Sequence, residues 1–97
     1  MYGLIGQLKA HPGQRDALVA VMLEGIGVMP GCRSYVVALD GTDADALWIT
    51  EVWEDKASHD ASLSLPAVQH TIARARPLIA GFGMRFETTP VGGVGIR

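Results

Sequence analysis

The sequence has little cysteine and no excess of positive charge. Its 97 residues contain one cysteine, Cys32, which excludes a disulfide within the chain and a cysteine metal cluster. Eight Lys and Arg residues stand against ten Asp and Glu residues, for a formal net charge of −2. The sequence has no run of basic residues, so a nucleic-acid-binding surface and a surface for anionic membranes are both disfavoured.

Long apolar runs are missing as well. No stretch approaches the 18 consecutive apolar residues of a membrane-spanning helix, and the first residues lack the pattern of a signal peptide. We therefore expect a soluble cytoplasmic protein. Apolar residues are nevertheless abundant, at 48% of the chain. Because a small domain buries only a limited fraction of its surface, this excess predicts that a partner subunit covers part of it.

The hydrophobic pattern predicts a single domain over residues 1–97, with a core at about 1–89 and a glycine-rich tail at 90–97. Strands are expected at residues 2–10, 32–39, 46–53 and 84–89. Helices are expected at 14–29, at 56–63 with Asp55 as N-cap, and along an apolar stripe from Val68 to Phe82. The resulting β-α-β-β-α-β order is the ferredoxin-like α+β arrangement, with a four-stranded antiparallel sheet.

The two central strands are apolar on both faces. Tyr35 and Val37 alternate with Val36, and Ile49 alternates with Trp48. The helices can cover only one face of the sheet, so a monomer would expose the other. An exposed apolar face of this size usually marks an interface, and the sequence therefore predicts a homodimer packed sheet to sheet.

One carboxylate interrupts the apolar third strand. Glu51 precedes Trp53 by two residues, so both side chains share a face with Ile49. Burying a carboxylate is costly unless it is paired. Two interpretations stay open: Glu51 pairs with a strand arginine, Arg33 or Arg85, or it faces a ligand.

Several motifs together resemble the antibiotic biosynthesis monooxygenase family of dimeric α/β-barrel proteins. They are the element order, the Pro30-Gly31-Cys32 entry into the second strand, Tyr35, the Glu51-x-Trp53-x-Asp55-x-Ala57 run and the Leu63-x-x-Pro66 that follows. The segment 74–82 is similar to small bacterial members assigned to a quinol monooxygenase subgroup. The resemblance extends to about Thr89. It implies a homodimer with a ligand cavity between the sheet and the helices of each subunit.

The resemblance also implies an activity. Some family members oxygenate quinols or anthrone-like aromatics with O2, using neither metal nor flavin; others degrade haem, and others have no settled activity. The leading hypothesis is a cofactor-independent monooxygenase that takes an electron-rich aromatic and O2 as substrates. Two alternatives remain: a non-catalytic dimer that binds a small hydrophobic molecule, and a haem-degrading monooxygenase. The sequence has no dinucleotide fingerprint, so the substrate itself would be the reductant.

His59 and Glu51 are the candidate catalytic residues, because either side chain can accept a proton from a phenolic substrate. Many family members carry a histidine where this chain has Ser62, and His59 lies three residues earlier on the same helix face. The three histidines have no metal-ligand spacing, and no metal site is predicted. The sequence does not decide which tryptophan faces the cavity, and the candidate substrate-binding residues are Trp53, Trp48, Tyr35, His70 and Arg85.

Overall fold

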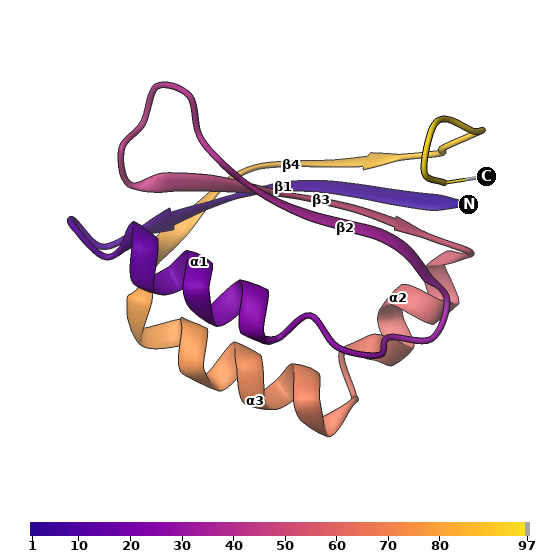
Figure 1. The fold of residues 1–97 in the computed structure, drawn as a ribbon, viewed down its shortest axis with the longest axis horizontal. Helices are drawn as coiled ribbons and strands as arrows, with labels where there is room; N and C mark the ends of the chain where they lie inside the picture. The colour runs from indigo at the N-terminus through magenta and orange to yellow at the C-terminus, as the bar shows by residue number, and fades with distance from the viewer. Residues whose placement is uncertain (97) are drawn as a thin grey trace.

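The computed structural model describes residues 1–96 as a four-stranded antiparallel sheet with helices on one face (Figure 1). The strands are β1 (Tyr2–Ala10), β2 (Cys32–Leu39), β3 (Ala46–Trp53) and β4 (Ile79–Thr88). The helices are α1 (Arg15–Glu24), α2 (Lys56–Ser62), α3 (Pro66–Ala75) and the short 3-10 helix η1 (Arg76–Leu78). The ferredoxin-like α+β fold is confirmed, and the two helices expected between β3 and β4 are present as α2 and α3.

The sheet has the strand order β2-β3-β1-β4. β2 and β3 form the expected hairpin, and Asp40 stabilises the turn between them by accepting hydrogen bonds from the backbone N–H groups of Thr42 at 2.8 Å and Asp43 at 2.9 Å. These hydrogen bonds, joined by one from Trp48, hold the pKa of the Asp40 carboxyl well below its usual range. β1 lies between β3 and β4 and pairs with both.

The first helix is shorter than expected. α1 ends at Glu24, so Ile26 and Met29 lie in the loop that follows rather than on the helix. The loop contains several glycines, which are unfavourable inside a helix. Gly25 also packs closely on α3, where an added Cβ would overlap the side chain of Thr71.

The last strand begins earlier than expected. β4 starts at Ile79, so Ile79 and Phe82 belong to a strand and not to the end of the helical stripe. Pro77 lies in η1, and α3 does not continue through it because proline has no N–H to donate and its ring clashes with the helical carbonyl four residues earlier. The strand accommodates Gly83 at a register shift between β1 and β4, where an added Cβ would overlap the side chain of Gln7.

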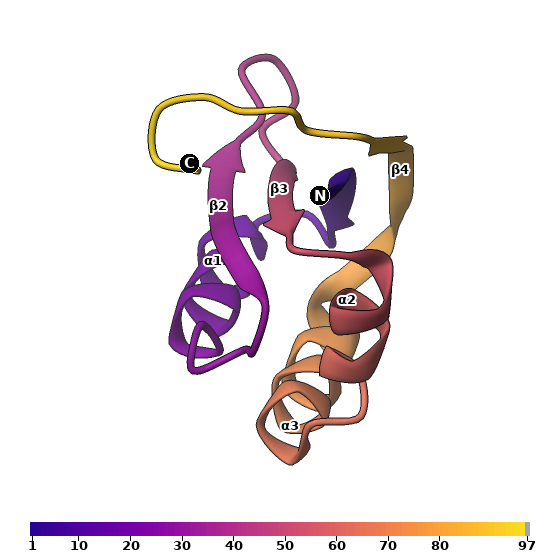
Figure 2. The ribbon, with the colours of Figure 1, turned by 90° about the vertical axis from the view of Figure 1, so that its right-hand side faces the viewer.

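The core lies between the sheet and the helices. Its largest fully buried side chains are Trp53, Leu18 and Leu47, and burying each such side chain stabilises the fold by about 1.5–3 kcal/mol. The outer face of the sheet carries Met84 and Phe86, which are 60% and 49% exposed. Residues 90–96 of the predicted tail cross above this outer face (Figure 2), and residue 97 lies outside the described residues.

Among residues 1–96, no helix combines the length and the apolar character needed to cross a membrane.

Candidate functional site

A cavity of about 400 Å³ lies between the inner face of the sheet and the helices. This volume falls within the range of small-molecule sites in proteins. The walls are mainly apolar, and residues from the sheet, from α1 and α3 and from the loop after α1 contribute to them. The polar side chains among them are Tyr35, Glu51, Trp53, His59, Ser62, Thr71 and Arg76.

Glu51 and Trp53 enter this cavity from β3. The indole Nε1–H of Trp53 donates a hydrogen bond to Oε1 of Glu51 at 3.1 Å. Burial raises the pKa of the Glu51 carboxyl, and this hydrogen bond together with the charges of His59 and Arg85 opposes the rise. Glu51 therefore binds its proton more tightly than a solvated glutamate does.

The arginines expected to pair with Glu51 pair elsewhere. Arg33 lies 3.8 Å from the carboxylate of Glu54, and Arg85 lies 3.7 Å from that of Glu87. Arg85 nevertheless acts on Glu51 through its charge, which lowers the pKa of the Glu51 carboxyl. The hydrogen-bond donor that holds this carboxyl is the neighbouring indole.

His59 reaches the cavity from α2. The helix begins after Asp55, whose Oδ1 accepts a hydrogen bond from the backbone N–H of Ser58 at 2.7 Å, and the predicted N-cap is thus confirmed. The buried His59 ring contacts two aromatic rings, with centroid distances of 5.4 Å to Tyr2 and 5.5 Å to Trp53. This packing fixes the position of the imidazole on the cavity wall.

A carboxylate on the same helix orients the imidazole. Nδ1 of His59 lies 3.1 Å from Oδ1 of Asp60, and Oδ2 of Asp60 lies 3.0 Å from Nζ of Lys56. A carboxylate at this position favours the tautomer with the proton on Nδ1. Nε2 is then the nitrogen that can accept a proton from a ligand.

Tyr35 lies beside Glu51 on the neighbouring strand, since the two residues are register partners of β2 and β3. Burial, followed by the nearby negative charge of Glu51, raises the pKa of the Tyr35 phenol. The phenol therefore stays protonated and can donate a hydrogen bond into the cavity.

The structure brings some of the candidate site residues together and separates the others. Tyr35, Glu51, Trp53 and His59 line one cavity. Three other candidates are not among its lining residues: Trp48, His70 and Arg85.

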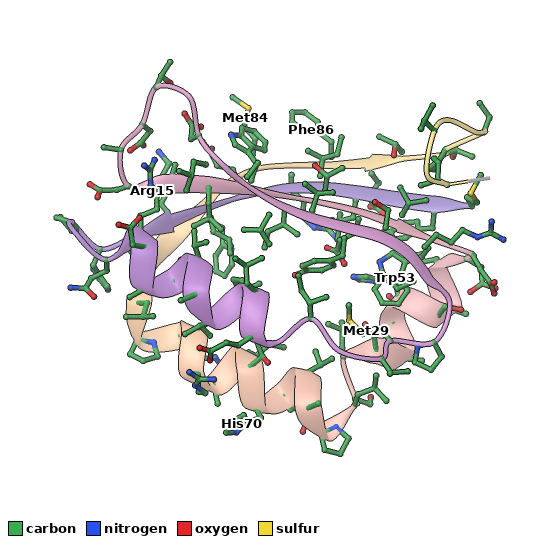
Figure 3. The ribbon with its side chains drawn as sticks, viewed as in Figure 1. Arg15, Met29, Trp53, His70, Met84 and Phe86 are labelled. Atoms are coloured by element: carbon green, nitrogen blue, oxygen red, sulfur yellow. The ribbon has the colours of Figure 1, made fainter. Side chains whose placement is uncertain are left out.

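Each of these three residues has another environment. Trp48 lies on the opposite face of β3 and donates its Nε1–H to Oδ2 of Asp40 at 2.7 Å. His70 is exposed on α3 and points away from the sheet (Figure 3). Arg85 is on β4 outside the cavity lining, although its charge lowers the pKa of Glu51.

Two lining residues, Thr71 and Arg76, are not among the candidates predicted from the sequence. Thr71 lies on the face of α3 that packs against Gly25, and Arg76 begins η1, where the chain turns back toward the sheet. The feature of the sequence that could have indicated Arg76 is Pro77, because a proline predicts that the helix ends just before it. Among residues 1–96, no group of three or more His, Cys, Asp or Glu side chains is arranged to hold a metal ion.

The sequence and the fold are both similar to those of known proteins. A family model described as antibiotic biosynthesis monooxygenase matches residues 1–74, and no curated protein matches the chain. A solved structure of a putative antibiotic biosynthesis monooxygenase from Chloroflexus aurantiacus J-10-fl is 62% identical over 99% of this chain and 98% of that one, with a TM-score of 0.94.

Two more distant solved structures share the fold. PA3566 from Pseudomonas aeruginosa is 18% identical over 94% of both chains, with a TM-score of 0.80. Rv0793 from Mycobacterium tuberculosis is 21% identical over 96% of this chain and 97% of that one, with a TM-score of 0.78.

Proposed function

The chain belongs to the antibiotic biosynthesis monooxygenase family, and from this membership we propose that it is a cytoplasmic monooxygenase acting on an electron-rich aromatic. The substrate is a quinol or an anthrone-like compound, the oxidant is O2, and the enzyme uses no cofactor of its own. The observation that supports this proposal most strongly is the meeting of Glu51, Tyr35 and His59 in one apolar cavity. Such a cavity excludes water while offering proton acceptors to a phenolic ligand.

The reaction begins with a proton transfer. Removing the proton of a phenolic hydroxyl raises the electron density of the ring and allows an electron to pass to O2. Burial raises the pKa of Glu51, which brings this carboxylate closer to the proton affinity of an efficient general base. His59, through Nε2, is the other candidate base on the same wall. Tyr35 supplies a hydrogen bond to the oxygen on which negative charge develops.

The substrate supplies every electron that the reaction needs. A benzene-1,4-diol and O2 give 2-hydroxy-1,4-benzoquinone and water, so one oxygen atom enters the ring and the other leaves as water. In an anthrone, the ring methylene becomes a carbonyl and the second oxygen atom again leaves as water. The enzyme therefore has to bind, deprotonate and desolvate its substrate rather than provide a redox centre.

Oxygen uptake with a panel of hydroquinones and anthrones tests the proposal. We expect uptake above the autoxidation rate of the buffer for at least one compound, with one atom of ¹⁸O from labelled O2 in the product. A panel on which no compound exceeds autoxidation would overturn it. Ligand binding without turnover would then favour the non-catalytic alternative. A Soret band that forms with haem and disappears on adding a reductant would favour haem degradation.

We propose further that the protein is a homodimer joined through the outer face of the sheet. This face carries the exposed apolar side chains of Met84 and Phe86 (Figure 3), and that of Val36, whose register partner on β3 is Thr50. Light scattering coupled to size-exclusion chromatography should give twice the mass of the chain for the wild type and a lower mass for Phe86→Asp. Val28→Asp, in the exposed loop after α1, is the matched control and should keep the dimer. A monomeric wild type would contradict the proposal.

A further inference from the structure

The ionisable side chains of the cavity lie at its two ends. Glu51, Trp53 and His59 form one end, close to α2 and the end of β3. Arg76 forms the other, at the junction of α3 and β4. Figure 1 shows α2 and this junction at opposite ends of the helical layer.

The register of β1 gives the length of the cavity. Glu51 pairs with Leu4, and Phe82, a lining residue beside the Arg76 end, pairs with Leu8. Four residues of a strand cover about 13 Å. The walls between the two ends are largely apolar and include Leu8, Met22, Ile49 and Ile72. The cavity therefore suits an elongated, flat molecule with a polar group at each end.

The other arginines in residues 1–96 have protein partners for their side chains, and Arg76 does not. Arg74 pairs with Glu24 at 2.9 Å, Arg85 pairs with Glu87, and Arg33 pairs with Glu54. Arg15 donates to the backbone carbonyls of the β2–β3 turn. The guanidinium of Arg76 makes no hydrogen bond or ion pair with any residue in 1–96, although the Arg76 backbone takes part in helix hydrogen bonds.

Arg76 is exposed to solvent at the edge of the cavity, and no carboxylate of the cavity lining lies beside it. The carboxylate in the cavity lining is that of Glu51, which lies at the far end. A guanidinium without a protein partner, beside an apolar surface, is suited to bidentate binding of a carboxylate.

We propose that the cavity selects an aromatic substrate that carries a carboxylate at the end opposite its reacting hydroxyl, and that Arg76 is the residue that recognises this acidic group. The assignment of the reacting end rests on the function proposed above. The recognition of the carboxylate does not require turnover, so it can be tested by binding alone.

Calorimetric titration with two matched ligands tests this recognition. 6-Hydroxy-2-naphthoate carries its hydroxyl and its carboxylate at opposite ends of the naphthalene, and its methyl ester lacks the charge. We expect the wild type to bind the acid about tenfold more tightly than the ester, because only the acid can form a charge-assisted hydrogen bond with the guanidinium of Arg76. Arg76→Met should remove this preference, and Arg76→Lys should restore part of it.

Arg74→Met is the matched control, because Arg74 lies two residues earlier, pairs with Glu24 and is not among the cavity-lining residues. It should keep the preference for the acid. Equal binding of acid and ester by the wild type would overturn the proposal, as would a preference that survives Arg76→Met or that Arg74→Met removes equally. Neither ligand has to react with O2, so these results hold whether or not the monooxygenase proposal does.

Discussion

The indole nitrogen of Trp53 lies 3.1 Å from Oε1 of Glu51, and the two side chains form one hydrogen-bonded unit on the inner face of β3. Trp53 is only 1% exposed, so its ring has little freedom to move. The unit therefore holds a carboxyl group at a fixed point of an apolar cavity without an arginine. A second carboxyl oxygen, Oε2, is left to meet a ligand.

Glu51→Gln should separate structure from chemistry. The amide oxygen of glutamine can still accept the hydrogen bond of Trp53, so the fold should remain, but an amide cannot act as a base. We expect turnover to fall by about a hundredfold or more, measured as O2 uptake, with little change in melting temperature. Glu54→Gln, whose carboxylate is exposed and pairs with Arg33, should leave turnover unchanged. Wild-type turnover in Glu51→Gln would exclude Glu51 as the base.

The same residue should make stability depend on pH. Burial raises the pKa of Glu51 in the folded chain above its ordinary value of 4.5, so the folded state binds this proton more tightly than the unfolded state. The stabilisation is fully present below the ordinary value and is lost as pH rises through the folded pKa. The melting temperature of the wild type minus that of Glu51→Gln should therefore decrease with increasing pH. A difference that increases would contradict the direction of the shift.

Gly6→Val should reduce the space available to a ligand. Gly6 is the register partner of Ile49, which lines the cavity, and nothing lies within 4 Å of an added Cβ. Valine suits a strand and should stabilise the fold by about 0.5–1 kcal/mol, while the affinity for 6-hydroxy-2-naphthoate should fall about tenfold through overpacking. Calorimetry and thermal melting measure the two effects.

Gly81→Val is the control for this variant. Gly81 pairs with Lys9 on the outer face of the sheet, and an added Cβ there also meets nothing within 4 Å. This variant should bind the ligand as the wild type does. Equal losses of affinity in both variants would show that the effect does not come from the cavity.

Asp55→Ala should loosen the helix that carries His59. The variant loses the hydrogen bond from the backbone N–H of Ser58 to Asp55, and we expect the melting temperature to fall by several degrees. Hydrogen bonds that Ser58 donates to the carboxylate lower the pKa of Asp55, so this stabilisation is present above the ordinary Asp pKa and is lost as pH falls through the folded value. Asp55→Ser keeps a cap and should melt close to the wild type. A melting temperature unchanged in Asp55→Ala would show that the cap is dispensable.

The strands β2 and β3 were predictable because the sequence signals that bound them are local. β2 is preceded by Pro30-Gly31, β3 follows the turn at Asp40, and both have the bounds expected from alternation. The end of α3 was not predictable in the same way, because Ile79 and Phe82 continue the helical spacing of apolar residues beyond the point where Pro77 ends the helix.

The candidate site was also predictable only where the sequence signal is local. Alternation along β3 places Glu51 and Trp53 together and Trp48 on the opposite face, but only the packing of the helices decides which face becomes the cavity. Arg76 could not be selected from local sequence, because its position depends on how η1 returns the chain to the sheet.

The strand order has a consequence for synthesis of the protein. β1 needs β4 as a partner along one side, and the pair joins Gly3 to Thr88. A ribosome makes β1 first and β4 last, so this side of β1 stays unpaired during most of translation. An unpaired edge is a template for strands of other chains. Emergence of β4 is therefore the event that completes the sheet and covers this side of β1.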